Sequence, residues 1–171
     1  MGFLFYLAFF ILIYSVQTAG LAFVKIGGVS PDLVLIFAFY CGSRFRENYG
    51  VAAAGLAGFV QDCLSGGLLG INTFSKGLIG FLVVSLRENI LVENFAPITI
   101  FTACASFIDG VIFYFVSTLF LDRSINEDVF FNSLPAFALY NALLGPALFY
   151  ILNRLQNLIE GKPRSGLSKL L

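Results

Sequence analysis

Three ionisable side chains stand inside otherwise apolar segments of the sequence, and they are its clearest candidates for chemistry. These residues are Asp62, Lys76 and Asp109. A charged group in the hydrocarbon of a membrane is costly unless it has a partner, so each of them should face other protein groups. Side chains of this kind could form structural ion pairs, bind a partner protein or take part in gating.

Asp62 and Lys76 are expected to pair with each other. A short Ser65-Gly66-Gly67 link joins their two segments, so both side chains should lie at a similar depth, in the outer third of a membrane. The simplest interpretation is a structural ion pair. A role in partner binding or gating remains open.

Asp109 lies near the middle of the fifth apolar segment. Hydroxyl side chains occur near its face at helical spacing, namely Thr102, Ser106 and Ser117. The sequence leaves two interpretations open: a carboxyl group with a purely structural role, or one wall of a buried polar pocket.

Small residues recur every four positions around Asp62. The set comprises Gly50, Ala54, Gly58, Asp62, Gly66 and Gly70. Small residues at this spacing let two helix backbones approach closely, which is how membrane helices associate without a hydrophobic driving force. We therefore predict that this face packs on another helix, either of this chain or of a partner.

Residue types needed for catalysis or metal binding are scarce in the sequence. It contains no His, and its three cysteines, Cys41, Cys63 and Cys104, lie singly in apolar segments. Neither a catalytic triad nor a metal-ligand cluster nor a phosphate-binding loop can be assembled from it. The net charge is zero, which gives no basis for nucleic-acid binding. We expect a protein without enzymatic activity, metal or cofactor.

The overall composition indicates a membrane protein. Of the 171 residues, 58% are hydrophobic and only 12% are charged, and the mean hydropathy is +0.90. Charged residues make up about a quarter of an ordinary soluble domain. The first segment carries no charge through residue 24 and has no basic region before its apolar core, so it is expected to be a retained span and not a signal peptide.

Six apolar segments can be distinguished. They are residues 3–24, 33–43, 49–64, 71–86, 96–121 and 134–152. A helix needs about 20 apolar residues to cross the hydrocarbon core, so the second segment, which Asp32 precedes and Arg44 and Arg46 follow, is too short unless other protein shields it. The Gly145-Pro146 pair is expected to kink the sixth.

The distribution of Lys and Arg predicts the orientation in the membrane. With the N-terminus inside, seven basic residues fall in cytoplasmic connections, and the outer connections hold only Lys25 and Arg123. The cytoplasmic ones are Arg44, Arg46, Arg87, Arg154, Lys162, Arg164 and Lys169. The predicted fold is an all-α integral membrane protein with six transmembrane helices, the second one short, and both termini cytoplasmic. Residues 1–160 would form the transmembrane domain and residues 161–171 a short basic cytoplasmic tail.

A pattern of glycines and polar residues runs through residues 31–87. Its parts are Pro31-Asp32-Leu33, the basic Arg44-Phe45-Arg46, glycines 50, 55 and 58, the run QDCLSGGLLG over residues 61–70, and GLIG over residues 77–80. Together with the length, the number of spans and the loop pattern, it resembles the rod shape-determining MreD family. Asp62 matches the acidic position of that family's third helix.

The resemblance implies a function and a set of partners. MreD proteins are multi-pass proteins of the bacterial inner membrane that act as scaffolds in the cell-elongation machinery, surrounded by membrane lipids. Their expected direct partner is MreC, a single-span protein with a large extracytoplasmic part. Through it they connect to the MreB filament and to the peptidoglycan synthases of the lateral wall. Their fold is similar to the six-helix substrate-binding components of energy-coupling-factor transporters.

Two other functions remain open from the residues alone. A substrate-binding subunit of a small-molecule, vitamin-type transporter would need several converging polar groups, and Thr102, Asp109, Tyr140 and Asn141 are the candidates. A homo-oligomeric channel would need a polar stripe along one whole span, and no such stripe is continuous in the sequence.

Overall fold

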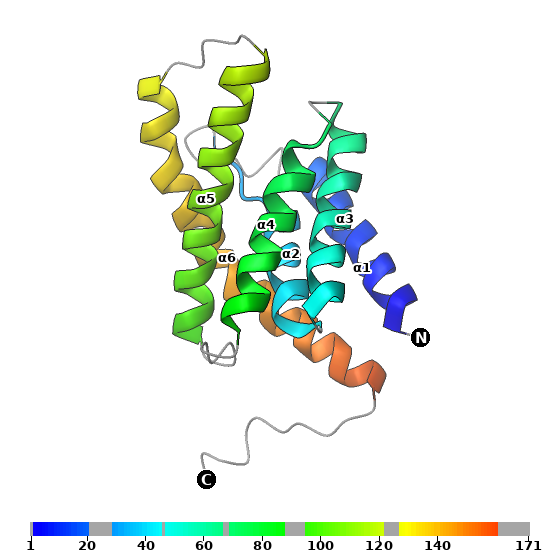
Figure 1. Cartoon of the computed structure of the whole chain (residues 1–171). Helices are drawn as coiled ribbons and strands as arrows, with labels where there is room; N and C mark the ends of the chain where they lie inside the picture. Colours follow the sequence, from blue (N-terminus) through cyan, green and yellow to red (C-terminus); the bar gives the residue numbers. More distant parts are fainter. Residues whose placement is uncertain are drawn as a thin grey trace.

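The structure is a computed structural model of the 171-residue chain, and it describes residues 2–20, 29–45, 47–66, 69–87, 95–121 and 127–160. Over these residues the regular elements are six α-helices and one short π-helix (Figure 1). Their bounds are α1 Gly2–Ser15, η1 Val16–Gly20, α2 Leu33–Arg44, α3 Glu47–Ser65, α4 Ile71–Leu86, α5 Phe95–Leu121 and α6 Glu127–Glu160. The six-helix, all-α fold predicted from the sequence is confirmed.

Helix lengths differ from the predicted segments at the two ends of the chain. The first α-helix ends at Ser15 and passes into η1, and residues 21–24 of the predicted first segment lie outside the described residues. The sixth helix extends beyond the predicted segment in both directions and has 34 residues, with Pro135 and Pro146 inside it. The predicted kink at Gly145-Pro146 stays a prediction.

Two helices of the described part are long and apolar enough to cross a membrane on their own. These stretches are Phe95–Phe120 in α5 and Phe130–Leu158 in α6. Shorter apolar helices occur at Tyr6–Ala19, Leu33–Arg44 and Ile71–Leu86. The predicted tail, residues 161–171, and three basic residues used to predict the orientation, Lys25, Arg46 and Arg123, lie outside the described residues.

The short helix α2 forms the centre of the bundle. It contacts α1, α3, α4, α5 and α6, and Figure 1 shows it in the middle of the assembled helices. Nine consecutive residues, 34–42, are buried. Asp32 is its N-cap and accepts a hydrogen bond from the backbone N of Leu35 at 3.0 Å. The prediction of a short second helix shielded by protein is confirmed, and Asp32 lies just outside the helix as its N-cap.

Helices α3 and α4 contact each other through small residues. A Cβ atom added at Gly80 would lie 2.6 Å from Cβ of Ala54. A Cβ atom added at Gly58 would overlap the backbone carbonyl of Asn72. Only small residues permit such an approach of two helix backbones, so the partner of the predicted small-residue face is α4 of the same chain.

The small-residue stripe has two separate roles along its length. Its first members contact α4, and a Cβ atom at Gly50 would lie 3.0 Å from Cγ2 of Val84. Its last two members, Gly66 and Gly70, have φ angles of 64° and 107°, and a Cβ atom on either would meet nothing within 4 Å. Their positive φ angles favour glycine, so these two residues form the turn and do not extend the packed face.

The exterior of the described helices is apolar and the interior holds polar groups. Exposed large side chains of α5 and α6 include Phe107, Phe113, Phe115, Leu119, Phe120, Phe131, Leu139, Leu143 and Tyr150. Buried polar or charged side chains are Asp32, Asp62, Ser75, Lys76, Thr102, Ser106, Asp109, Ser117 and Asn141. An extended apolar exterior of this kind is typical of a surface that lipid or another protein covers.

Candidate functional site

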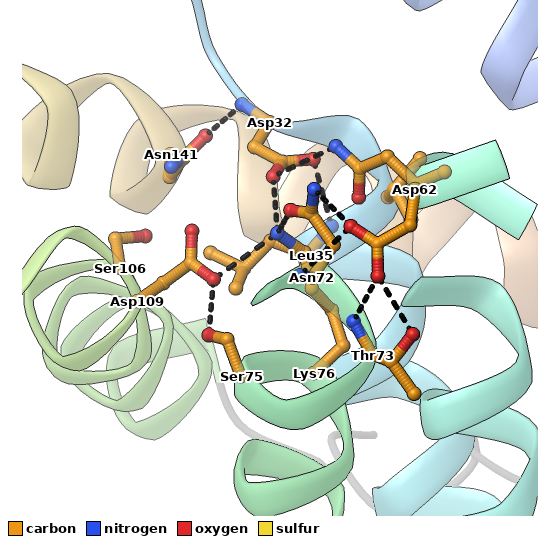
Figure 2. Close-up of polar contacts among 12 residues, drawn as sticks. Asp32, Leu35, Asp62, Asn72, Thr73, Ser75, Lys76, Ser106, Asp109 and Asn141 are labelled. Atoms are coloured by element: carbon orange, nitrogen blue, oxygen red, sulfur yellow. Dashed lines mark hydrogen bonds and ion pairs between the residues drawn. The ribbon is translucent and has the colours of Figure 1, made fainter. Parts of the chain in front are cut away.

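Lys76 is the centre of a buried ionic cluster. Its side chain is 1% exposed, and its Nζ lies 2.9 Å from Oδ2 of Asp32 and 3.1 Å from Oδ1 of Asp109. It also donates to Oδ1 of Asn72 at 2.7 Å. An ammonium group has three donors, and all three have an acceptor here. Figure 2 shows the two carboxylates approaching Lys76 from two segments, Asp32 from just before α2 and Asp109 from α5.

The prediction that Asp62 pairs with Lys76 is wrong. The Asp62 carboxylate accepts hydrogen bonds from backbone N of Gly70 at 2.9 Å, of Asn72 at 3.0 Å and of Thr73 at 2.9 Å. It also accepts from Nδ2 of Asn72 at 2.9 Å and Oγ1 of Thr73 at 2.7 Å (Figure 2). The turn brings the first residues of α4 against Asp62, whereas Lys76 lies a full helical turn beyond Asn72. Asp62 and Lys76 are linked through Asn72, whose side chain bonds both of them.

Asp62 caps a helix other than its own. The N-cap residue of α4 is Gly70, which has no side chain to accept from the free N–H groups of the first turn. The carboxylate of Asp62 supplies that acceptor from α3, and its negative charge also suits the positive end of the α4 dipole. Asp62 is buried, with 1% of its surface exposed, so it fixes the α3–α4 hairpin.

Asp62→Ala should therefore lower the free energy of unfolding by about 2–4 kcal/mol, because the backbone N–H groups of Gly70, Asn72 and Thr73 lose a charged acceptor. Thermal or denaturant unfolding in detergent micelles, followed by circular dichroism, measures this. The matched control is Asp128→Ala in the exposed first turn of α6, which should change stability by no more than about 0.5 kcal/mol. Equal losses in the two variants would contradict the capping role.

Asp32 joins three further elements to the cluster. Its backbone N donates to Oδ1 of Asn141, on α6, at 2.8 Å. Its carboxylate accepts from Nε2 of Gln17, on η1, at 3.3 Å and from Nε2 of Gln61, on α3, at 3.4 Å. Sequence reasoning placed Asp32 at the start of α2 but missed it as a partner of the buried lysine. A signal was available, since Asp32 borders an apolar segment and only one of the six predicted segments contains a base, Lys76.

Asp109 faces α4 and not the hydroxyl groups of its own helix. Ser75 donates a hydrogen bond to its Oδ1, and Lys76 bonds the same atom (Figure 2). The hydroxyl of Ser106 donates to the backbone O of Thr102 at 2.8 Å. The hydroxyl groups of Thr102 and Ser117 are buried without a hydrogen-bond partner. The hydroxyl residues near Asp109 in sequence therefore do not form a polar site with it.

The cluster connects all the helices of the bundle except α1, which continues into η1. Contributions come from Gln17 of η1, Asp32 before α2, Asp62 of α3, Lys76 of α4, Asp109 of α5 and Asn141 of α6. Among the described residues no three His, Cys, Asp or Glu side chains are placed to hold a metal ion. The hydrogen bonds and ion pairs of the cluster join residues of different helices, so the arrangement suits a role in fixing helix positions.

A pocket of about 540 Å³ opens beside the cluster. Asp32, Gln61, Asn72 and Asp109 line it, as do aromatic side chains of α5 and α6. The expectation that Asp109 could form one wall of a polar pocket thus agrees with its position. Of the other three residues considered for a ligand site, Thr102, Tyr140 and Asn141, none lines this pocket.

A family model described as rod shape-determining protein MreD matches residues 1–159 of the chain. The chain belongs to the MreD family. The matched region includes every residue of the ionic cluster, from Gln17 to Asn141. MreD proteins determine rod shape and are not a known enzyme family. No curated protein and no solved structure matches the chain.

Proposed function

We propose that this MreD-family protein is a non-enzymatic scaffold of the bacterial inner membrane that binds MreC and connects it to the MreB filament and the lateral-wall peptidoglycan synthases. The observation that carries the proposal is the apolar exterior of the described helices. Large apolar side chains are exposed on the outside of the bundle, and Lys76 pairs with Asp32 and Asp109 inside it. Such an exterior suits docking by other membrane helices.

The membrane topology is part of the same proposal. Residues 1–160 form a six-helix transmembrane domain with both termini cytoplasmic, and residues 161–171 form a basic cytoplasmic tail. The seven-to-two excess of Lys and Arg supports this orientation. The apolar stretches of α5 and α6 support insertion. The helices shorter than a bilayer would span it as parts of a bundle in which α2 is enclosed by protein.

Reporter fusions test the orientation. A fusion after Lys162 should report the cytoplasm, and one inserted within residues 124–128 should report the outer side. The physical reason is that connecting segments rich in Lys and Arg are retained in the cytoplasm. Paired reporters, one active only inside and one active only outside, should give opposite results at each position. The same side at both positions would contradict the six-span topology.

Depletion and capture test the scaffold function. In a rod-shaped bacterium whose own copy of this protein is depleted, cells should become round, and re-expression of the tagged chain should restore rods. MreC should elute with the tagged chain from detergent-solubilised membranes and should not elute with an unrelated tagged six-helix protein. Persistent rods after depletion, together with an eluate free of MreC, would overturn the proposal.

One observation favours a second candidate function, the substrate-binding subunit of a small-molecule transporter. The pocket of about 540 Å³ has the size of a ligand site. A transporter subunit should retain a small molecule through purification, and mass spectrometry of the extracted protein would detect it. Rod shape that is unaffected by depletion, combined with such a molecule, would favour this second function.

A further inference from the structure

Two oxygen atoms at the pocket have no hydrogen-bond donor among the described residues. Both bonds to Asp109 end on Oδ1, so its Oδ2 receives no hydrogen bond from the described residues and is open to the pocket that the residue lines. Oε1 of Gln61 is also buried without a partner. The amide of Gln61 is oriented by the bond from its Nε2 to Asp32, which leaves the oxygen as the free end. A buried acceptor without a donor is costly, and an open carboxylate oxygen accepts hydrogen bonds, so the pocket favours an occupant that donates.

The charge of the cluster favours a cationic occupant. The described interior holds three buried carboxylates, those of Asp32, Asp62 and Asp109, and one buried ammonium group, that of Lys76. Asp32 and Asp109 both pair with Lys76, and Asp62 receives only uncharged donors. The described interior therefore carries excess negative charge, which a positively charged ligand would offset.

Aromatic rings complete the lining of the pocket. Phe113 of α5 and Phe130 and Phe137 of α6 lie along it. The face of an aromatic ring attracts a cation, and the rings also supply contact for the carbon atoms of an organic ion. A volume of about 540 Å³ is more than a bare metal ion needs. Acceptors, negative charge and aromatic walls together define the chemistry of the ligand.

We propose that this pocket binds a primary ammonium group, with Oδ2 of Asp109 and Oε1 of Gln61 as acceptors and the phenylalanine rings around the attached carbon atoms. A free amine and the headgroup of an ethanolamine lipid present the same group. Neither source requires the scaffold function, so the proposal can fail or succeed independently of it.

Thermal unfolding of the purified full-length chain in detergent micelles, followed by circular dichroism, tests the proposal. Ethanolamine, which is protonated at pH 7, should raise the unfolding temperature in a saturable way, by about 3–6 °C at ten times its Kd. Ethylene glycol has nearly the same shape without the charge and should give no saturable rise. Sodium chloride at equal ionic strength controls for screening of charges.

A pocket-filling variant separates binding in the pocket from effects elsewhere. Ser133 lines the pocket and bonds only the backbone O of Phe130 in its own helix, so Ser133→Phe fills the space and leaves the ionic cluster intact. Asn132→Phe adds the same ring at an exposed neighbouring position outside the pocket. The rise with ethanolamine should disappear in Ser133→Phe and persist in Asn132→Phe. Asp109→Asn should also abolish it, although that variant alone would not distinguish lost binding from lost folding.

Lipids added to the micelles distinguish the two sources of the ammonium group. Phosphatidylethanolamine should stabilise the wild-type chain more than phosphatidylcholine does, and Ser133→Phe should remove the difference, if the source is a lipid headgroup. A response to soluble ethanolamine alone assigns a free amine. The proposal is overturned if ethylene glycol acts as well as ethanolamine, if Ser133→Phe responds like the wild type, or if neither ethanolamine nor the lipid has an effect.

Discussion

Lys76→Met is expected to lower the free energy of unfolding by about 3–5 kcal/mol, the loss typical of breaking a buried ion pair by removing one partner. Methionine keeps most of the length of the lysine stem, so the main change is the loss of charge. Asp32 and Asp109, which both pair with Lys76, would then be buried without a cation. Because the two carboxylates belong to different parts of the bundle, helix packing around α2 should weaken. Equilibrium unfolding in detergent micelles measures the loss.

The matched control for this substitution is Arg154→Met. Arg154 is exposed on α6 and has no ion pair within the described part of the chain. Its replacement should change stability by no more than about 0.5 kcal/mol. If the two variants lose the same stability, the cluster around Lys76 does not stabilise the bundle.

The second large effect is expected at Gly58. A Cβ atom at this position would overlap the backbone carbonyl of Asn72, and a backbone atom cannot move aside as a flexible side chain can. Gly58→Ala should therefore separate α3 from α4 and lower the free energy of unfolding by about 1–3 kcal/mol, the range for overpacked interiors. Gly58→Leu should be worse, with less folded protein recovered from membranes.

Gly55→Ala is the matched control, since it makes the same change three residues away on the same helix. A Cβ atom at Gly55 would have its nearest neighbour, Cα of Gly77, at 3.9 Å, which is an ordinary contact. Alanine also favours the helix by up to about 1 kcal/mol over glycine, so Gly55→Ala should be neutral or stabilising. Equal tolerance at both positions would contradict the close contact of α3 with α4.

Local patterns in the sequence were enough to predict the helices. Asp32 marked the start of α2, and Arg44 and Arg46 marked its end. Glycine spacing marked the face of α3 that contacts α4. These signals depend on neighbouring residues within one helix or one turn. The ends of α6 were missed because they are less apolar than its middle, and a helix can extend past the apolar stretch that identified it.

The pairing of the buried charges could not be obtained in the same way. Depth along the membrane normal suggested Asp62 as the partner of Lys76, because a tight turn joins their segments. Depth does not specify which way a side chain points around its helix. The Asp62 carboxylate accepts hydrogen bonds from backbone N–H groups at the start of α4. Lys76 points instead toward α2 and α5. Those contacts join residues 33 and 44 positions apart, which no short-range pattern contains.

Double-mutant cycles test the central claim most directly. This claim is that Lys76 stabilises the helix bundle by pairing with Asp109 and Asp32. In the cycle of Lys76→Met with Asp109→Asn, the double variant should lose less stability than the two single losses combined, with a coupling energy of about 1–3 kcal/mol. The cycle of Lys76→Met with Asp62→Asn should show a smaller coupling, within about 0.5 kcal/mol, because those residues meet only through Asn72. Additive losses for Lys76 with Asp109, together with strong coupling to Asp62, would contradict the account.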